Sequence, residues 1–554
     1  MPLTESSQTT TVTGTGNITV QVVGSGNTLS IGASFDLQLI LPSEVDFHKN
    51  LAHQHQLDPT SEFIEYVGQE NIQSTVTSWL DSDKLVYVLA VKGRGGAGKT
   101  RLALKTCRDS EKMGWSAGFI RRAEAERMMA HMNFAGRGWD KDTLIVFDYA
   151  MAFDKLSTFL QQLADNQSLE RQRGKTDPVR KLRVMLLERE ATLSGGWLKG
   201  IIPNGHGSGR VLSLFHSPPV LELLPLQSVE MRRQVMARTL ENLGGDVVLP
   251  EPGCDPSYEH WLNDMSWAGD PLYLMMAAMF VHERGLSKAL NLEWSELVYY
   301  IADEELKRVA RLAGRDRDRN AVLKHLTAFA TLCGGLGADD QLKVIREECF
   351  ALGRESCGSP ADLRDLLTQA LPGLDDGVCP IQPDLIGEAV ILKALGEGKA
   401  KQAKEALLRA YALCPREVQQ CLVRMVQDFE SVDVRCVNWL KSVAAESGLN
   451  MGELGISISE TTAVSQLHVN FKAKQDFMQV GLPKTAGEQL RGEVANAHLG
   501  MVWKSLPIYL ASTDHLIQSV EPLKEEAELH KDLTNINRNV YLAVQASSPK
   551  KQAT

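Results

Sequence analysis

The stretch VYVLAVKGRGGAGKTRLAL, residues 86–104, decides the fold of this chain. Its first seven residues, Val86–Lys92, are an apolar run rich in valine, which predicts a buried strand. The next eight, residues 93–100, fit the pattern G-x-x-x-x-G-K-[ST] of a phosphate-binding loop. A helical run begins at Arg101. A glycine-rich turn that merely contains Gly-Lys-Thr is the alternative, but the flanking strand and helix argue against it and favour a nucleotide site.

The chemistry of a triphosphate explains this spacing. Backbone N–H groups in a concave loop can replace the water that the anion loses, provided that no Cβ lies in the way. The positive end of the following helix favours the same phosphates. Lys99 would add a point charge at the β- and γ-phosphates, and Thr100 would offer a hydroxyl to Mg²⁺. The expected nucleotide contacts in this stretch are Gly93, Gly95, Gly96, Ala97, Gly98, Lys99, Thr100 and Arg101.

Composition limits the class of protein. A chain of 554 residues is too long for one core and predicts about three to five domains. The net charge of -10 gives no whole-chain case for nucleic-acid binding. The nine cysteines are scattered without a Cys-x-x-Cys pair, which indicates reduced core residues rather than disulfides or a zinc site. No signal peptide is recognisable, and the longest apolar run, residues 271–281, is too short to span a bilayer, so we expect a cytoplasmic protein.

Two further strands end in charged residues. Residues 142–150 read DTLIVFDYA, so a buried strand would deliver Asp148 to the edge of the sheet beside the phosphates, where it could hold Mg²⁺. Another apolar run, residues 183–187, is followed by Glu188 and Arg189. We expect Arg189 to sense the γ-phosphate; a surface charge cluster is the alternative. Strands that alternate with helices predict a doubly wound parallel sheet with the nucleotide at the strand ends.

The rest of the chain divides by composition. Residues 1–33 repeat Gly-x-Gly-Asn turns between β-branched residues, which predicts either a small hairpin or tail, or a self-stacking segment that serves as a signalling motif. From residue 227 onward the pattern is mainly helical. The predicted regions are the β-prone segment 1–33, a linker 34–62, a P-loop nucleotide-binding domain 63–220, a helical domain 221–312, a winged-helix-like domain 313–398 and a C-terminal helical, sensor-like region 399–554.

Short motifs follow one another in a telling order: VGQE at 67–70, GGAGKTR at 95–101, FDYA at 147–150, LER at 187–189, LPL at 224–226 and GDPL at 269–272. Over roughly residues 63–395 this order resembles a bacterial STAND-class P-loop NTPase, a class related to NB-ARC, NACHT and NLR proteins. The resemblance implies two further nucleotide contacts, Val67 and Pro271, with Pro271 at the adenine. It also implies a winged helix around residues 383–388, which read PDLIGE.

The chain departs from this family at two positions. Gln69 stands where relatives often have arginine, and Met151 stands where many bacterial relatives have an acidic residue. The carboxylate that would activate water is therefore not obvious, and Asp154 and Glu188 are the candidates. Slow ATP hydrolysis would suit a switch, in which the bound state matters more than turnover.

The resemblance implies an ATP/ADP-binding, Mg²⁺-dependent signalling switch, with Lys99, Asp148 and Arg189 as its catalytic residues. ADP would hold a closed monomer, a trigger sensed by the C-terminal region would open it, and opened protomers would associate, as in bacterial antiphage defence. An ATP-driven remodelling ATPase and a STAND-type transcriptional regulator are the alternatives. Because no clear basic recognition helix is present, we do not expect nucleic acid as a partner. The trigger, the downstream partner and the size of the oligomer are left open.

Overall fold

The computed structural model describes residues 37–447, with gaps at 42–51, 132–140, 154, 174–179, 190, 192, 194–195, 203–207, 245–246, 264–268, 374–375 and 399. The chain divides after Leu467, and all described residues lie in the first unit. The β-prone segment 1–33, Asp154 and the C-terminal region beyond residue 447 lie outside the described residues, so the predictions about them stay predictions.

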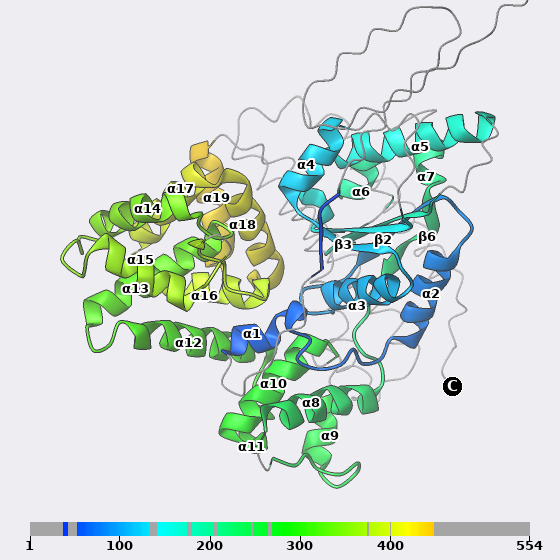
Figure 1. The fold of residues 1–554 in the computed structure, drawn as a ribbon. Coiled ribbons are helices and arrows are strands. Elements are labelled where there is room, and N and C mark those ends of the chain that lie inside the picture. The colour runs from blue at the N-terminus through cyan, green and yellow to red at the C-terminus, as the bar shows by residue number, and fades with distance from the viewer. Residues whose placement is uncertain are drawn as a thin grey trace, which may run out of the picture. The chain divides into compact units, whose positions relative to one another are not determined.

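A six-stranded sheet lies at the centre of the N-terminal half of the described residues (Figure 1). Its order is β1-β3-β4-β5-β2-β6, and every neighbouring pair is parallel except β1 with β3. The strands are β1 (Leu39–Ile40), β2 (Val86–Lys92), β3 (Ser116–Ile120), β4 (Thr143–Asp148), β5 (Leu182–Glu188) and β6 (Phe215–Glu222). The predicted parallel sheet is confirmed, and β2 has the predicted bounds. Neither edge strand, β1 nor β6, was predicted.

Helices cover both faces of the sheet (Figure 1). On one face lie α2 (Glu70–Asp81) and α3 (Lys99–Lys112); on the other lie α4 (Arg122–His131), α5 (Leu156–Arg173), α6 (Gly196–Ile201) and α7 (Ser208–Leu212). Alternate residues of a strand point to opposite faces. Val88 and Ala90 therefore join the core under α5, whereas Leu89 and Val91 join the core under α3. This two-sided burial explains why the strand reads as a continuous apolar run.

Helix α5 continues through a polar stretch. Its last eight residues, NQSLERQR, contain no helix breaker before Gly174, so the sequence allows the helix to reach Arg173 despite its polarity.

The remaining described residues are almost entirely helical. The helices are α8 (Val229–Leu243), α9 (Pro256–Asn263), α10 (Pro271–Arg284), α11 (Leu286–Ala289), α12 (Trp294–Leu312), α13 (Arg317–Leu332), α14 (Ala338–Ala351), α15 (Pro360–Ala370), α16 (Asp384–Gly396), α17 (Ala400–Leu413), α18 (Pro415–Phe429) and α19 (Arg435–Ser447). Helix α10 is the most deeply buried of them, since residues 272–281 are all buried. A helix that is covered on every side is apolar on every side, as its sequence is.

Two stretches bear on the domain predictions. Between α13 and α16, isolated bridges pair Leu336 and Pro372 with Val378, so any wing is reduced to single residue pairs, and the winged-helix interpretation stays a prediction. The predicted linker carries β1, a short helix α1 (His53–Leu57) and a 3-10 turn at Pro59–Ser61. Among the described residues, no helix is both long and apolar enough to cross a bilayer.

Candidate nucleotide-binding site

The predicted phosphate loop joins β2 to α3. Gly96 and Gly98 have φ angles of +83° and +96°, in the left-handed region that favours glycine. A Cβ atom on Gly96 would lie 3.1 Å from Leu272 Cβ, and one on Gly95 would lie 3.3 Å from the Asp428 carboxylate. The loop thus has neighbours on α10 and α18, with which a side chain at Gly95 or Gly96 would be in tight contact. A glycine cradle at the start of a helix fits a bound phosphate chain.

Lys99, the first residue of α3, folds back over this loop. Its Nζ donates to the carbonyl oxygens of Gly93 and Arg94, the latter at 3.1 Å. Burial, with the nearby positive charge of Arg189, lowers the pKa of Lys99 to about 8. A phosphate oxygen would offer this ammonium a charged acceptor in place of two neutral ones, which makes the stronger hydrogen bond.

The structure brings together the two predicted magnesium ligands. Thr100 lies in the first turn of α3, Asp148 ends β4, and the Thr100 hydroxyl donates to Asp148 Oδ2 over 3.0 Å. Burial raises the pKa of Asp148 to about 6, although Lys99 and the Thr100 hydrogen bond oppose the shift. A hydroxyl and a carboxylate are oxygen donors of the kind that Mg²⁺ prefers. These residues therefore fit a magnesium ion, which would neutralise phosphate charge when bound.

Arg189 follows β5, the strand between β2 and β4, so the topology alone places it between Lys99 and Asp148. It is buried, which rules out the surface charge cluster considered as an alternative. Its guanidinium donates to Asp428 Oδ2 at 2.6 Å and to Glu388 Oε1 at 3.3 Å. We call Arg189, Glu388 and Asp428 the latch, because they join the sheet edge to α16 and α18.

A second set of contacts runs parallel to the latch. Tyr149, next to Asp148, has a φ of +56°, and its hydroxyl donates to Asp384 at the start of α16. Arg424 of α18 lies 3.4 Å from Asp384 Oδ2 and donates to Glu388 Oε1 at 3.2 Å. Its guanidinium also lies 5.1 Å from the centre of the Tyr149 ring. The end of β4 and the C-terminal helices are therefore tied by a network of charged groups.

The Gly-Asp-Pro motif ties the phosphate loop to α10. Asp270 is fully buried at the N-cap of α10 and pairs with Arg94 of the loop. Burial raises the pKa of Asp270 to about 6, and the charge of Arg94 opposes the shift. The carbonyl of Gly269 accepts a hydrogen bond from Leu226 N at 2.6 Å, which places the LPL motif beside the N-terminus of α10. The phosphate loop and the LPL and GDPL motifs therefore meet here in space.

A cavity of 480 Å³ opens beside these groups, within the usual size of a ligand pocket. The predicted site residues that line it are Gly95, Gly96, Gly98, Lys99, Thr100, Arg101, Asp148, Arg189 and Pro271. Gly93, Ala97 and Val67 are not among its lining residues. Gly93 supplies a carbonyl to Lys99, and Val67 packs against the helical core. Their predicted contacts with a nucleotide stay predictions.

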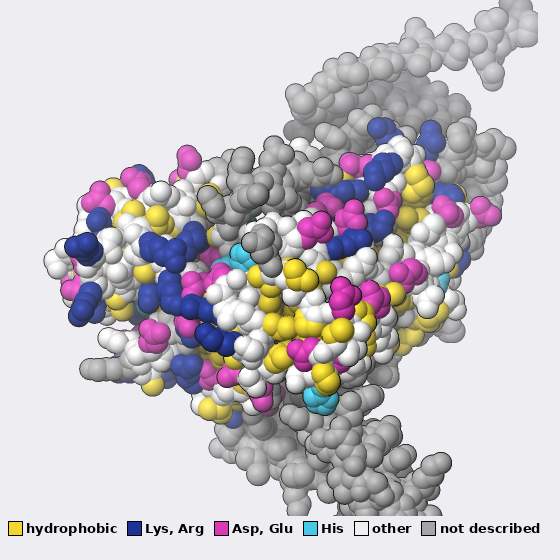
Figure 2. Space-filling view, turned by 90° about the horizontal axis from the view of Figure 1, so that it is seen from below, with side chains coloured by type: hydrophobic (Ala, Val, Ile, Leu, Met, Phe, Trp, Pro, Cys, Tyr) yellow, Lys and Arg dark blue, Asp and Glu magenta, His cyan; other side chains and the backbone are white. Residues whose placement is uncertain are grey.

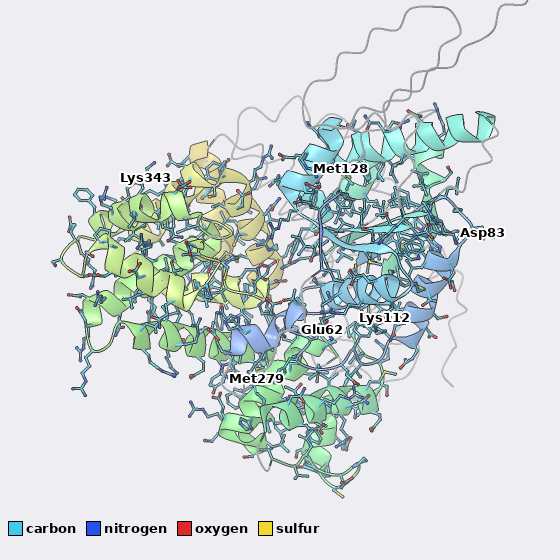
Figure 3. All side chains as sticks on the ribbon, in the orientation of Figure 1. Glu62, Asp83, Lys112, Met128, Met279 and Lys343 are labelled. Atoms are coloured by element: carbon cyan, nitrogen blue, oxygen red, sulfur yellow. The ribbon has the colours of Figure 1, made fainter. Side chains whose placement is uncertain are left out.

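Sequence reasoning missed one wall of this cavity. Gln56, Leu57, Phe63 and Ile64 line it, and all of them lie in or beside the predicted linker. Arg101 positions this segment, because its Nη2 donates to Ile64 O at 2.9 Å. Its Nη1 lies 3.2 Å from Glu62 Oε2, and Glu62 stands between α1 and α3 (Figure 3). No motif signals these residues; the apolar pair Phe63–Ile64 is the only hint in the sequence.

Charges elsewhere on the surface are mixed. Figure 2 shows Lys and Arg side chains gathered toward the left of one face, with Asp and Glu side chains among them. In the stretch 308–319, where arginine and aspartate alternate, Asp318 pairs with Arg354, and Arg319 lies 3.8 Å from Asp362. The charges of Arg319 and Arg354 are thus opposed by neighbouring carboxylates.

The phosphate loop, the parallel sheet and the helix after the loop make a P-loop nucleotide-binding fold. No protein-family model and no curated protein matches the chain. Solved structures with some similarity include Aeropyrum pernix ORC1 in complex with DNA (13% identity, 61% of this chain, 96% of that chain, TM-score 0.28). A second is Pyrobaculum aerophilum Cdc6p (15% identity, 60% of this chain, 96% of that chain, TM-score 0.26). A third is AMPPCP-bound DnaA from Aquifex aeolicus (11% identity, 66% of this chain, 98% of that chain, TM-score 0.28).

TM-scores below 0.5 are too low to transfer a property from these proteins to this chain. Membership of the STAND class and the role in defence therefore stay predictions, and so does the expectation that nucleic acid is not a partner.

Proposed function

We propose that this chain is an ATP/ADP-binding NTPase in which the nucleotide controls the contact between the sheet and helices α16 and α18. The observation that carries the proposal is the position of Arg189. It follows the strand that lies between the phosphate-loop strand and the strand of Asp148, but its guanidinium donates hydrogen bonds to Glu388 and Asp428. In this proposal Arg189 senses phosphate, and its guanidinium is bound by carboxylates of α16 and α18, the helices that would move.

Competition for Arg189 gives the switch its physical basis. A γ-phosphate beside Lys99 would offer the guanidinium another anion, whereas ADP lacks that group. Arg189 would then leave its carboxylate partners for the γ-phosphate. Asp428, which lies against Gly95, would be repelled by the negative charge of that phosphate. Removing one partner of a buried ion pair is strongly unfavourable for the partner left behind. ATP would therefore favour separation of α18 from the loop, and ADP would tolerate the closed latch.

The position of Glu188 supports slow hydrolysis. Its Oε1 accepts from Arg189 N at 2.8 Å, and its Oε2 accepts from Met151 N at 3.2 Å. Burial raises the pKa of this carboxyl, and the two backbone hydrogen bonds oppose the shift. A general base must reach the water that it activates. Glu188 is not among the residues that line the cavity, and each of its oxygens already accepts one backbone hydrogen bond, so it is poorly placed for fast turnover in this arrangement.

An ATP-driven remodelling ATPase is the second candidate, because the same loop, lysine and Asp148 would serve it equally well. It requires that the latch open repeatedly and that Glu188 be released in the open form. Association of opened protomers belongs to the switch proposal and is tested by comparing the mass of the particle with ADP and with ATP.

The deciding measurement is to denature freshly purified protein and identify the nucleotide that it releases. Stoichiometric ADP from a monomer supports the switch. Turnover of added ATP near the typical ~10 s⁻¹ would instead favour the remodelling ATPase. A protein that neither carries nor binds any nucleotide contradicts both candidates.

A further inference from the structure

The cavity has an apolar part that the phosphate chemistry does not use. Besides the loop, its lining includes Leu57, Phe63, Ile64, Leu272 and Met275. Apolar walls with a few placed polar groups are the usual surroundings of a flat ligand such as a nucleobase. The polar group that would orient such a base is therefore the one to look for.

Gln56 is that group. Its side chain lines the cavity although the residue is only 6% exposed, and its amide oxygen is buried without a hydrogen-bond partner. Buried polar atoms in native proteins nearly always have a partner, and a ligand in the cavity that Gln56 lines could supply the donor for this oxygen. The short helix that carries Gln56 is fixed, because the backbone N–H of Gln54 donates to Glu305 Oε1 of α12 at 3.0 Å.

We propose that Gln56 is the residue that selects adenine, on the premise that the cavity is the nucleotide site of the proposed function. An amide pairs with adenine by accepting from the N6 amino group and donating to the adjacent ring nitrogen. Guanine carries an acceptor, O6, at the position of that amino group. The unpaired acceptor of Gln56 thus matches a donor that adenine has at this position and guanine lacks.

The test measures equilibrium binding of three probes to the full chain: ATP, GTP and purine riboside triphosphate, which is ATP without the N6 amino group. Wild-type protein should bind ATP about tenfold more tightly than either of the others, the usual effect of one lost hydrogen bond at a polar buried group. In Gln56→Leu, ATP and purine riboside triphosphate should bind equally. Equal binding of these two probes by the wild type overturns the proposal without any variant.

Gln54→Leu is the matched control. Gln54 lies on the same helix and also has a buried amide oxygen without a partner, but it does not line the cavity. It should leave the preference for ATP unchanged.

The outcomes separate this inference from the proposed function. If wild-type protein prefers ATP and Gln56→Leu keeps that preference, Gln56 is not the selecting residue, while the nucleotide site stands. If wild-type protein binds none of the three triphosphates, the proposed function fails and this inference fails with it.

Discussion

The two halves of the site differ in how they are encoded. The phosphate loop occupies eight consecutive residues, and the phosphate contacts expected of it would come from its backbone N–H groups and from side chains beside them. The latch joins Arg189 to Glu388 and Asp428, which lie 199 and 239 residues away along the chain. The phosphate loop is formed by residues that are adjacent in the sequence. The residues of the latch are far apart in the sequence and meet only when the chain has folded. A sequence pattern therefore predicts where the phosphates bind, and only the structure suggests how the nucleotide could be coupled to movement.

The largest expected effect comes from the local half. Lys99→Ala should lower the affinity for ATP about 100-fold, since a charge-assisted contact contributes up to ~3 kcal/mol. Isothermal titration of the full chain measures the change. The latch does not contain Lys99, so amide exchange in α18 should stay as in the wild type.

Lys105→Ala is the matched control on the same helix. Lys105 pairs with Asp109 at 2.7 Å, away from the loop, and its removal should leave ATP affinity unchanged. An equal loss in both variants would mean that Lys99 acts through the stability of α3 rather than through phosphate.

The next prediction concerns Gly269, which brings the GDPL motif into close contact with the LPL motif. A Cβ atom at this position would lie 2.5 Å from Pro225 Cβ, so Gly269→Ala must displace the LPL motif or α10. We expect it to lower the free energy of unfolding by about 1–3 kcal/mol, as overpacked positions do. Urea unfolding of the variant against Gly200→Ala measures this, because Gly200 has no heavy atom within 4 Å of the added Cβ. Equal stability of the two variants would contradict the close contact.

The features that could be predicted from the sequence are those formed by residues close together in the chain, as in the phosphate loop, and those that could not be predicted are long-range, as in the latch. Strand β2 was predicted to the residue, and Thr100 and Asp148 were predicted as a pair that meets. Both follow from periodicity and from the rule that parallel strands end at one edge of the sheet. The partners of Arg189 could not be predicted, because a single carboxylate on a helix forms no sequence pattern that names its partner. Gln56 was missed for a similar reason, since its role depends on the cavity that later residues close around it.

The next prediction addresses the latch itself. Asp428→Asn keeps the shape and the acceptor oxygen but removes the charge that faces Arg189. Amide exchange across residues 415–429 should become about tenfold faster, the equivalent of ~1.4 kcal/mol less protection. Hydrogen exchange with mass spectrometry measures it in the absence and presence of ATP.

Asp433→Asn provides the comparison. Asp433 pairs with Arg435 at 2.6 Å, two residues along the chain, so the local charge change is similar while the latch is untouched. If both variants speed exchange in α18 equally, the latch does not hold this helix. In that case the coupling between the two halves of the site would need another explanation.

The smallest effect concerns pH. Because burial raises the pKa of Asp148 to about 6, its carboxylate is available to Mg²⁺ above that pH and is protonated below it. The gain in ATP affinity on adding Mg²⁺ should therefore fall by about threefold as pH drops through 6, a modest effect like that of other partly screened contacts. Folding should respond in the opposite sense. A raised pKa in the folded state stabilises the fold fully below the ordinary pKa of 3.8, and this stability is lost as pH rises through about 6.

These opposite slopes separate a metal ligand from a structural carboxyl. ATP itself titrates near this range, so the informative quantity is the difference between wild type and Asp148→Asn, which should lose both slopes. Asp142→Asn, at the other end of the same strand segment, is the control, because Asp142 accepts from Lys181 N at 2.8 Å and lies away from the loop. If Asp148→Asn keeps the Mg²⁺-dependent slope, the ion is held by other groups. The pairing of Thr100 with Asp148 would then belong to the packing of the sheet edge rather than to the nucleotide site.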